Sequence, residues 1–133
     1  MTTLQTVVAF MTTEFPQSRV TVEAVGSKAS VVRRDVGVDA LRPGGTVSGP
    51  VMMEVADVAL YVAILGEVGI VPLAVTTSLN INFLRKPVAS QALIGRCELL
   101  KVGRSLVIGE VSIYSEGTEE PVAHAVGTYA LPR

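Results

Sequence analysis

The segment from Pro50 to Glu67 is the feature of the sequence that most constrains the fold. It is apolar at nearly every position, with few polar exceptions. A helix that is apolar on all sides has to be buried on all sides. Ser48 or Gly49 can cap this helix, and proline suits a first helical turn because its missing N–H would have no partner there. We therefore predict a long helix over 50–67 that is enclosed either by a curled sheet or by a sheet together with a neighbouring subunit.

The rest of the chain contains signals for one further helix and six strands. Residues 3–14 carry apolar side chains at helical spacing, and residues 20–36 alternate as two strands joined at Gly26-Ser27. Residues 37–49 are rich in glycine and proline and indicate a loop. Four more strand-like stretches follow the long helix: 74–84, 91–102, 106–115 and 121–131. This order favours an α+β fold in which an antiparallel sheet wraps around one long central helix.

Length and composition exclude several classes of protein. The 133 residues predict a single domain over 1–133, and the formal net charge of −1 gives no sign of nucleic-acid binding. The only cysteine, Cys97, is typical of a reducing compartment, so we expect a cytoplasmic protein. The only histidine, His124, excludes a multi-histidine metal site. The longest apolar run, 55–65, is too short to span a bilayer.

Three polar residues interrupt the apolar helix on one face. Glu54, Asp57 and Tyr61 are spaced at i, i+3 and i+7, so they lie on the same side. One interpretation is a carboxylate at the edge of an apolar cleft, available as a base or nucleophile. The other is a narrow stripe that faces solvent. The pattern alone is compatible with both.

The strand after the helix has one polar face. Thr76, Ser78, Asn80 and Asn82 alternate with residues that are mostly apolar. This face is either an ordinary solvent-exposed surface or a polar wall across from the helix that a partner subunit shares.

Four motifs, taken in order, resemble a known family. They are the helix start with Asp57 nine residues after Ser48, the strand 77–85 that ends in Leu84-Arg85, the turn Gly103-Arg104-Ser105, and the last strand, 122–129. Their order and spacing resemble the hot-dog fold acyl-CoA thioesterases, in particular the phenylacetate-pathway and 4-hydroxybenzoyl-CoA branch. The resemblance covers roughly residues 40–131 and implies a hot-dog fold.

The resemblance also implies a catalytic arrangement. Asp57 would act as nucleophile or general base at the thioester, and the Gly49 N–H at the helix start would polarise the carbonyl. Thr76 stands where some relatives carry a hydroxyl that orients water. Two positions depart from the family pattern, because Ser48 replaces the usual histidine and Pro50 replaces a second glycine. Ser48 can hydrogen-bond the thioester or cap the helix, whereas Pro50 has no N–H to donate.

Substrate contacts follow from the same resemblance. Arg104, in its turn with Gly103 and Ser105, and the pair Arg85 and Lys86 would be candidates for coenzyme A phosphates. Glu54 is a second carboxylate on the face of Asp57 and ranks below it because its spacing does not match. Tyr61 is a candidate lining residue on that face, although apolar and aromatic residues at helical spacing are more often plain core.

The family implies acyl-CoA as the small-molecule partner, no separate cofactor and no metal. It also implies a homodimer or homotetramer with sites at the interface, where Asp57 of one chain would lie near Thr76 of another. Because of Ser48 and Pro50, a non-catalytic acyl-CoA-binding protein remains the alternative. A hot-dog dehydratase is disfavoured, since His124 lacks the surrounding motif, and a structural oligomer without a ligand is the simplest remaining reading.

Overall fold

The predicted long helix is present as α2, Gly49–Val68, in the computed structural model, which describes residues 2–132. It begins and ends within one residue of the predicted bounds. The Ser48 hydroxyl caps it by accepting a hydrogen bond from the Val51 N–H at 3.3 Å. Gly69 ends it with φ of 112°, a left-handed backbone conformation that favours glycine.

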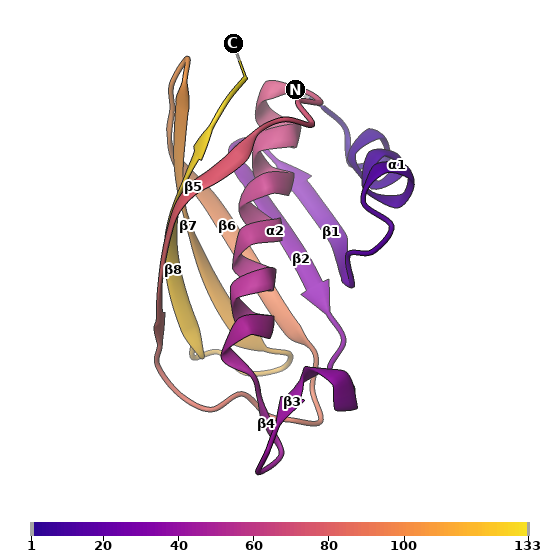
Figure 1. Cartoon of the computed structure of the whole chain (residues 1–133), viewed down its shortest axis with the longest axis vertical. Coiled ribbons are helices and arrows are strands. Elements are labelled where there is room, and N and C mark those ends of the chain that lie inside the picture. Colours follow the sequence, from indigo (N-terminus) through magenta and orange to yellow (C-terminus); the bar gives the residue numbers. More distant parts are fainter. Residues whose placement is uncertain (1, 133) are drawn as a thin grey trace.

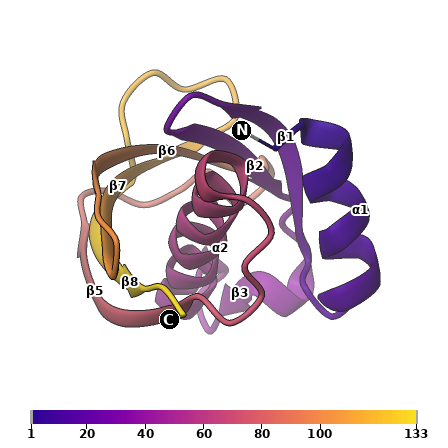
Figure 2. The same ribbon diagram turned by 90° about the horizontal axis from the view of Figure 1, so that it is seen from above.

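A six-stranded antiparallel sheet curls around α2 and covers it on most sides (Figures 1 and 2). One face, which carries Met53, Asp57 and Tyr61, stays at least partly exposed, so a single chain does not enclose the helix completely. The strands lie in the order β1-β2-β6-β7-β8-β5. Their bounds are β1 Val20–Gly26, β2 Ala29–Arg34, β5 Val75–Phe83, β6 Leu93–Val102, β7 Leu106–Ser115 and β8 Ala123–Ala130. The predicted α+β fold, an antiparallel sheet wrapped around one central helix, is therefore confirmed.

The segment predicted as a loop, 37–49, contains short regular elements. A 3-10 helix, η1 (Val38–Ala40), is followed by a two-residue ladder between β3 (Leu41–Arg42) and β4 (Thr46–Val47). Gly44 and Gly45 make its turn with positive φ angles of 95° and 78°. Glycine and proline signals indicate a turn correctly but do not reveal so short a ladder.

The N-terminal helix, α1 (Leu4–Glu14), lies beside β1 (Figure 2). Thr3 caps it by accepting a hydrogen bond from the Thr6 N–H, and Val7 and Met11 are buried under it. Phe15 follows its last residue and packs against the core. This end of α1 thereby approaches α2, where the Phe15 ring lies 6.5 Å from that of Tyr61.

Two facing glycines seat α2 on the sheet. Gly109 of β7 and Gly127 of β8 are directly paired, and a Cβ at either position would lie 2.5–2.7 Å from the side chain of Leu60. Leu60 is 1% exposed, so it fills the depression that the two glycines leave. No helix among the described residues is long and apolar enough to cross a membrane.

Gly127→Ala is expected to lower the free energy of unfolding by about 1–3 kcal/mol, because the new methyl group overpacks the core against Leu60. Gly26→Ala is the matched control, since nothing lies within 4 Å of a Cβ there. Urea denaturation of both variants measures the difference. Equal stabilities would contradict the close packing of Leu60 on this glycine pair.

Candidate active site

The carboxylate of Asp57 is held by two hydroxyl groups from the sheet. Its Oδ1 accepts hydrogen bonds from Thr76 Oγ1 at 2.6 Å and from the Tyr129 hydroxyl at 2.7 Å. Both donors act on the same oxygen, and Oδ2 has no hydrogen-bond partner among residues 2–132. The carboxylate is thus fixed in orientation with one oxygen available for chemistry.

A β-bulge turns Thr76 toward Asp57. Thr76 pairs with Tyr129 and Ser78 pairs with Thr128, so Thr77 is an extra residue in β5. Because a bulge resets the alternation of side chains, Thr76 lies on the inner face and not with Ser78 on the outer one. The prediction that Thr76 shares one polar face with Ser78, Asn80 and Asn82 is therefore wrong for Thr76. Alternation of polar and apolar residues cannot reveal a bulge.

Thr76 and Asp57 make this contact within one chain. The expected contact of Asp57 with Thr76 of another subunit is therefore replaced by a contact with Thr76 of the same chain. The bulge is the physical reason, because it brings the hydroxyl to its own helix.

Tyr129 is a site residue that the sequence analysis did not select. Burial raises the pKa of its phenol well above the usual range, and the negative charge of Asp57 raises it further. The phenol therefore stays protonated and acts as a donor. Its position opposite Thr76 depends on the register of β5 and β8, which the sequence does not state.

Tyr129→Phe is expected to lower kcat about 10- to 100-fold, the cost of removing one hydrogen bond to a charged group. KM should change less, because the phenol contacts Asp57 and not the bulk of a ligand. Tyr114→Phe is the matched control, since Tyr114 lies on the other side of the sheet. A steady-state comparison in which both variants keep wild-type kcat would exclude this role for Tyr129.

A cavity of about 490 Å³ opens beside Asp57. This volume is within the range of small-molecule sites, about 300–1,000 Å³. The wall is formed by α1 and the residues after it, by α2, by the start of β5 and by β8. The lining residues are Phe10, Glu14, Phe15, Gln17, Asp57, Val58, Tyr61, Pro72, Ala74, Val75, Thr76 and Tyr129.

Tyr61 lies at the centre of the aromatic wall of this cavity. Its ring centroid is 6.1–6.5 Å from those of Phe10, Phe15 and Tyr129, and its hydroxyl donates to the Pro72 carbonyl. Burial raises the pKa of Tyr61. The structure thus brings Tyr61 and Asp57 together, with two phenylalanines that the sequence analysis had not selected.

Gly49 is the first residue of α2, and Asp57 lies about two turns further along the helix. The two residues are eight positions apart, which corresponds to about 12 Å along a helix. A Cβ at Gly49 would lie 3.3 Å from the Phe83 ring, at the last residue of β5. One chain therefore does not bring the Gly49 N–H and Asp57 to the same carbonyl.

A second cavity, of about 570 Å³, lies at the Gly49 end. Its lining includes Gly49, Pro50 and three basic residues, Arg42, Arg85 and Lys86. Arg85 also donates to the Pro121 carbonyl and lies 3.5 Å from Glu120. Arg42 was not selected from the sequence, because only the β3–β4 hairpin brings it to this end.

The predicted Gly103-Arg104-Ser105 turn is at the opposite end of the sheet from Arg85. It precedes Leu106, which pairs with Ala130, and Ala130 in turn pairs with Val75 at the start of β5. The Ser105 carbonyl accepts from the Leu131 N–H at 2.8 Å. Arg104 of one chain therefore lies far from Arg85 and Lys86 of the same chain. The three cations are predicted to contact coenzyme A together, and one chain does not bring them together.

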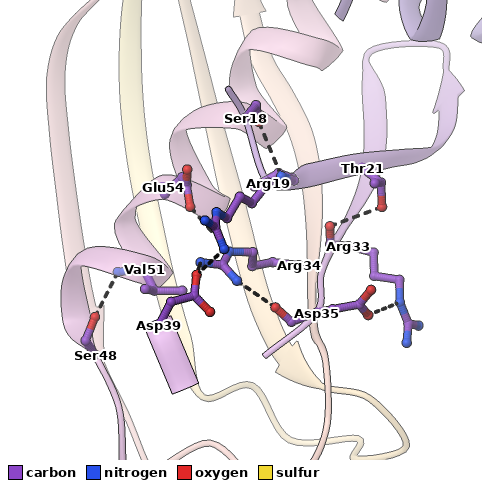
Figure 3. A network of polar contacts seen from close by, with 11 residues as sticks. Ser18, Arg19, Thr21, Arg33, Arg34, Asp35, Asp39, Ser48, Val51 and Glu54 are labelled. Atoms are coloured by element: carbon purple, nitrogen blue, oxygen red, sulfur yellow. Dashed lines mark hydrogen bonds and ion pairs between the residues drawn. The ribbon is translucent and has the colours of Figure 1, made fainter. Parts of the chain in front are cut away.

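Glu54 belongs to a network of ion pairs around Arg34 (Figure 3). Its Oε1 lies 3.5 Å from Nε of Arg34, a buried arginine that also contacts Asp39 at 3.2 Å. Asp39 in turn pairs with Arg19 at 2.6 Å. These ion pairs connect η1 and the first turns of α2 to β2. Glu54 thus has a basic ion-pair partner, whereas Asp57 has none among the described residues.

The remaining polar candidates lie away from Asp57. His124 Nε2 is 3.0 Å from Glu110 Oε1, and both residues lie on the outer face of the sheet. No group of three or more His, Cys, Asp or Glu residues that could hold a metal ion occurs within the described part of the chain.

The sequence matches the pattern of the thioesterase superfamily over residues 44–122. The chain belongs to this superfamily. No curated protein matches it. Among solved structures, it resembles a thioesterase candidate from Silicibacter sp. TM1040, with 39% identity over 98% of this chain and 92% of the other, at a TM-score of 0.90.

Two more distant structures share the fold. Zebra fish thioesterase superfamily member 2 has 21% identity and a TM-score of 0.86, over 99% of this chain and all (100%) of the other. The PaaI protein of the E. coli phenylacetic acid degradation operon has 16% identity and a TM-score of 0.82, over 99% and 97% of the two chains. The superfamily match and the 39% identical structure confirm the predicted hot-dog thioesterase family.

Proposed function

We propose that this protein hydrolyses an acyl-CoA thioester to the free acid and coenzyme A, with Asp57 as general base or nucleophile. The observation that carries the proposal is the Asp57 carboxylate, fixed by Thr76 and Tyr129 at the wall of a cavity with Oδ2 free. A structural neighbour from Streptococcus pneumoniae TIGR4, 19% identical, was crystallised with coenzyme A. That neighbour supports a coenzyme A thioester as the class of substrate.

In the general-base form of the reaction, Asp57 Oδ2 takes a proton from a water molecule as the water oxygen bonds to the thioester carbon. The carbonyl oxygen becomes negative and is stabilised by a backbone N–H at a helix start. The carbon–sulfur bond then breaks, and the thiolate of coenzyme A takes the proton from Asp57. The products are the acid and the thiol, and no further cofactor takes part.

A second copy of the chain completes this site in our proposal. A base and an oxyanion donor must both lie within about 3 Å of their reacting atoms. Gly49 lies beside Phe83 and Asp57 beside Thr76, at opposite ends of β5. An antiparallel pairing of two β5 strands, with Thr76 opposite Phe83 of the second copy, would bring Asp57 of one chain to Gly49 of the other.

The edge of β5 is suited to such pairing. Among the described residues, β5 ends the sheet and pairs only with β8, and its nine residues include no charged residue and no proline. Its bulge lies at its start, at Thr77, so the stretch from Ser78 to Phe83 keeps a regular register. Exposed edges of natural sheets are usually protected by charges, prolines or bulges. The opposite edge, β1, has such protection, because it carries Glu23 and a bulge between Val22 and Ala24. We propose a homodimer through β5 as the functional unit, and a homotetramer would contain two of these dimers.

Charge supports the same arrangement. In the paired dimer, the basic cavity at Gly49 of one chain would adjoin the Asp57 cavity of the other. Arg42, Arg85 and Lys86 would then contact coenzyme A phosphates, and Arg104 would approach them from the Asp57 side. Phosphate groups favour such clusters because hydrogen bonds between charged groups are strong.

A thiol-release assay over a panel of acyl-CoAs tests the proposed activity. Hydrolysis of at least one member above the uncatalysed rate, with loss in Asp57→Asn, is the expected result. Equal rates for wild type and Asp57→Asn would contradict the role of Asp57, and no hydrolysis of any member would contradict the activity.

Cys97 is expected not to interfere with this assay. Its thiol is 4% exposed, and burial raises the pKa of Cys97 to about 12. The reactive thiolate is therefore nearly absent at pH 8. A disulfide reagent such as DTNB should leave the native protein unmodified at pH 8 and titrate one thiol per chain after denaturation. Rapid reaction of the native protein would contradict this burial.

The cytoplasm remains the proposed location of the protein.

One observation favours a second candidate function. Pro50 lies in the first turn of α2 and offers no N–H, and the Ser48 hydroxyl accepts from Val51 as a helix cap. A non-catalytic acyl-CoA-binding protein would need fewer donors at this helix start than an enzyme. Micromolar binding of acyl-CoA without hydrolysis in the same assay would favour that function over the first.

A further inference from the structure

The cavity beside Asp57 has an uneven distribution of charge. Its described lining residues include two carboxylates, Asp57 and Glu14, and no basic side chain. The cavity at Gly49 has the opposite character, with Arg42, Arg85 and Lys86 and no carboxylate. The two cavities therefore suit chemically different parts of one ligand.

The apolar part of the Asp57 cavity is formed largely by aromatic rings. The chain has three phenylalanines and three tyrosines, and Phe10, Phe15, Tyr61 and Tyr129 all line this cavity. Such a wall favours apolar groups, because aromatic side chains bury large apolar areas. The volume of about 490 Å³ limits these groups to compact ones. These rings carry no positive charge that could pair with a carboxylate.

Glu14 stands where local structure disfavours an acid. It is the last residue of α1, and the partial negative charge at a helix C-terminus repels a carboxylate. None of the ion pairs between described residues involves Glu14, and no basic residue occurs in the last turn of α1. A residue that breaks a local rule without a compensating contact is often retained for function.

We propose that this cavity receives the acyl group and that Glu14 determines its charge, so that compact neutral acyl groups are accepted and acyl groups with a terminal carboxylate are rejected. The inference rests on the proposed thioesterase function, since it assigns the acyl part of that substrate. Glu14 and Asp57 both repel a carboxylate on the acyl group. Asp57 cannot be replaced without loss of the reaction, so Glu14 is the position at which this repulsion can be changed. Glu14 is thus a specificity-determining residue and takes no part in the chemistry.

The test compares acyl groups of equal length with and without a terminal carboxylate: butyryl-CoA with succinyl-CoA, and hexanoyl-CoA with adipoyl-CoA. Wild type should favour the neutral member of each pair at least about tenfold in kcat/KM, as expected for one like charge at a partly exposed site. Glu14→Lys should shift both ratios toward the carboxylate-bearing member by about tenfold or more.

Glu23→Lys is the matched control, because it makes the same charge change on β1, beside a different cavity. It should leave both ratios unchanged. Glu14→Lys places a basic residue at the end of α1, so its melting temperature should equal or exceed that of wild type. Hydrolysis with unchanged ratios in Glu14→Lys would overturn the inference and leave the thioesterase function standing.

Binding of uncleavable thioethers separates the inference from the activity. Calorimetry would compare S-butyl-CoA with S-(3-carboxypropyl)-CoA on wild type and Glu14→Lys. If no thioester is hydrolysed, the proposed function fails, and a charge preference in binding that Glu14→Lys shifts would still support the acyl cavity. Equal binding of the two thioethers to both proteins would overturn the assignment of this cavity to the acyl group and of Glu14 to charge selection.

Discussion

Asp57→Asn is expected to lower kcat for acyl-CoA hydrolysis by about 10²–10⁴-fold, the usual contribution of a general base. Asparagine has nearly the shape of aspartate and keeps an oxygen that can accept from Thr76 and Tyr129. It cannot take a proton from water or attack a carbonyl. KM should stay close to that of wild type, because the acyl cavity is unchanged. Steady-state kinetics on the best substrate measures both quantities.

Glu54→Gln is the informative comparison for this variant. Glu54 is three residues before Asp57 on the same face of α2, but its carboxylate lies beside Arg34. We expect a much smaller loss of kcat, since Asp39 still pairs with Arg34. Equal losses in Glu54→Gln and Asp57→Asn would contradict the assignment of Asp57.

Isotope labelling distinguishes the two roles open to Asp57. In a single turnover in H₂¹⁸O, a general base leads to ¹⁸O in the product acid. A nucleophile forms an anhydride with the acyl group, and water that attacks the Asp57 carbon of this anhydride leaves ¹⁸O in the enzyme. The free Oδ2 is compatible with both roles.

Gly49→Pro is expected to lower kcat by about 10²–10³-fold, the loss seen when one oxyanion donor is removed. Proline is accommodated at the first position of a helix, and Ser48, with φ of −74° and ψ of 147°, already has the backbone conformation that proline requires of the residue before it. The substitution therefore removes an N–H with little change in the helix.

Gly49→Ala is the matched control because it keeps the N–H. Its Cβ would lie 3.3 Å from the Phe83 ring, and a displacement of that ring by a few tenths of an ångström relieves the contact. We expect activity within about threefold of wild type, since transition-state contacts are retained. Equal losses in Gly49→Pro and Gly49→Ala would show that the Gly49 N–H has no part in the reaction.

Patterns that are local in the sequence predicted the fold well. The apolar run of α2, the alternation of the strands and the turn residues between them each depend on neighbouring positions. The strand bounds therefore agree within two residues for β5 to β8. The superfamily spacing selects Asp57 over Glu54, and the structure gives the two carboxylates different partners.

The features that the sequence did not reveal depend on distant contacts. Tyr129 reaches Asp57 from 72 residues away, and α1 contributes Phe10 and Glu14 to a cavity on α2. The bulge at Thr77 changes one side chain's direction without changing the strand's composition. No local pattern records which strand register or which loop brings such residues together.

The two departures from the family pattern at the start of α2, Ser48 and Pro50, both have a structural role. Ser48 acts as the helix cap, and Pro50 occupies a position in the first turn that suits proline. Gly49 is left as the donor at this helix start, about 12 Å from Asp57 of its own chain. The proposed activity therefore depends on a site made by two chains.

Mixing the two inactive variants tests this shared site most directly. In a heterodimer of Asp57→Asn with Gly49→Pro, one site carries both defects, and the other combines Asp57 of one chain with Gly49 of its partner. After unfolding and refolding together in equal amounts, half of the dimers are mixed, so activity should recover to about a quarter of the wild-type value, as the two-fold symmetry requires. Activity that stays at the sum of the separately refolded variants would contradict a site shared between two chains.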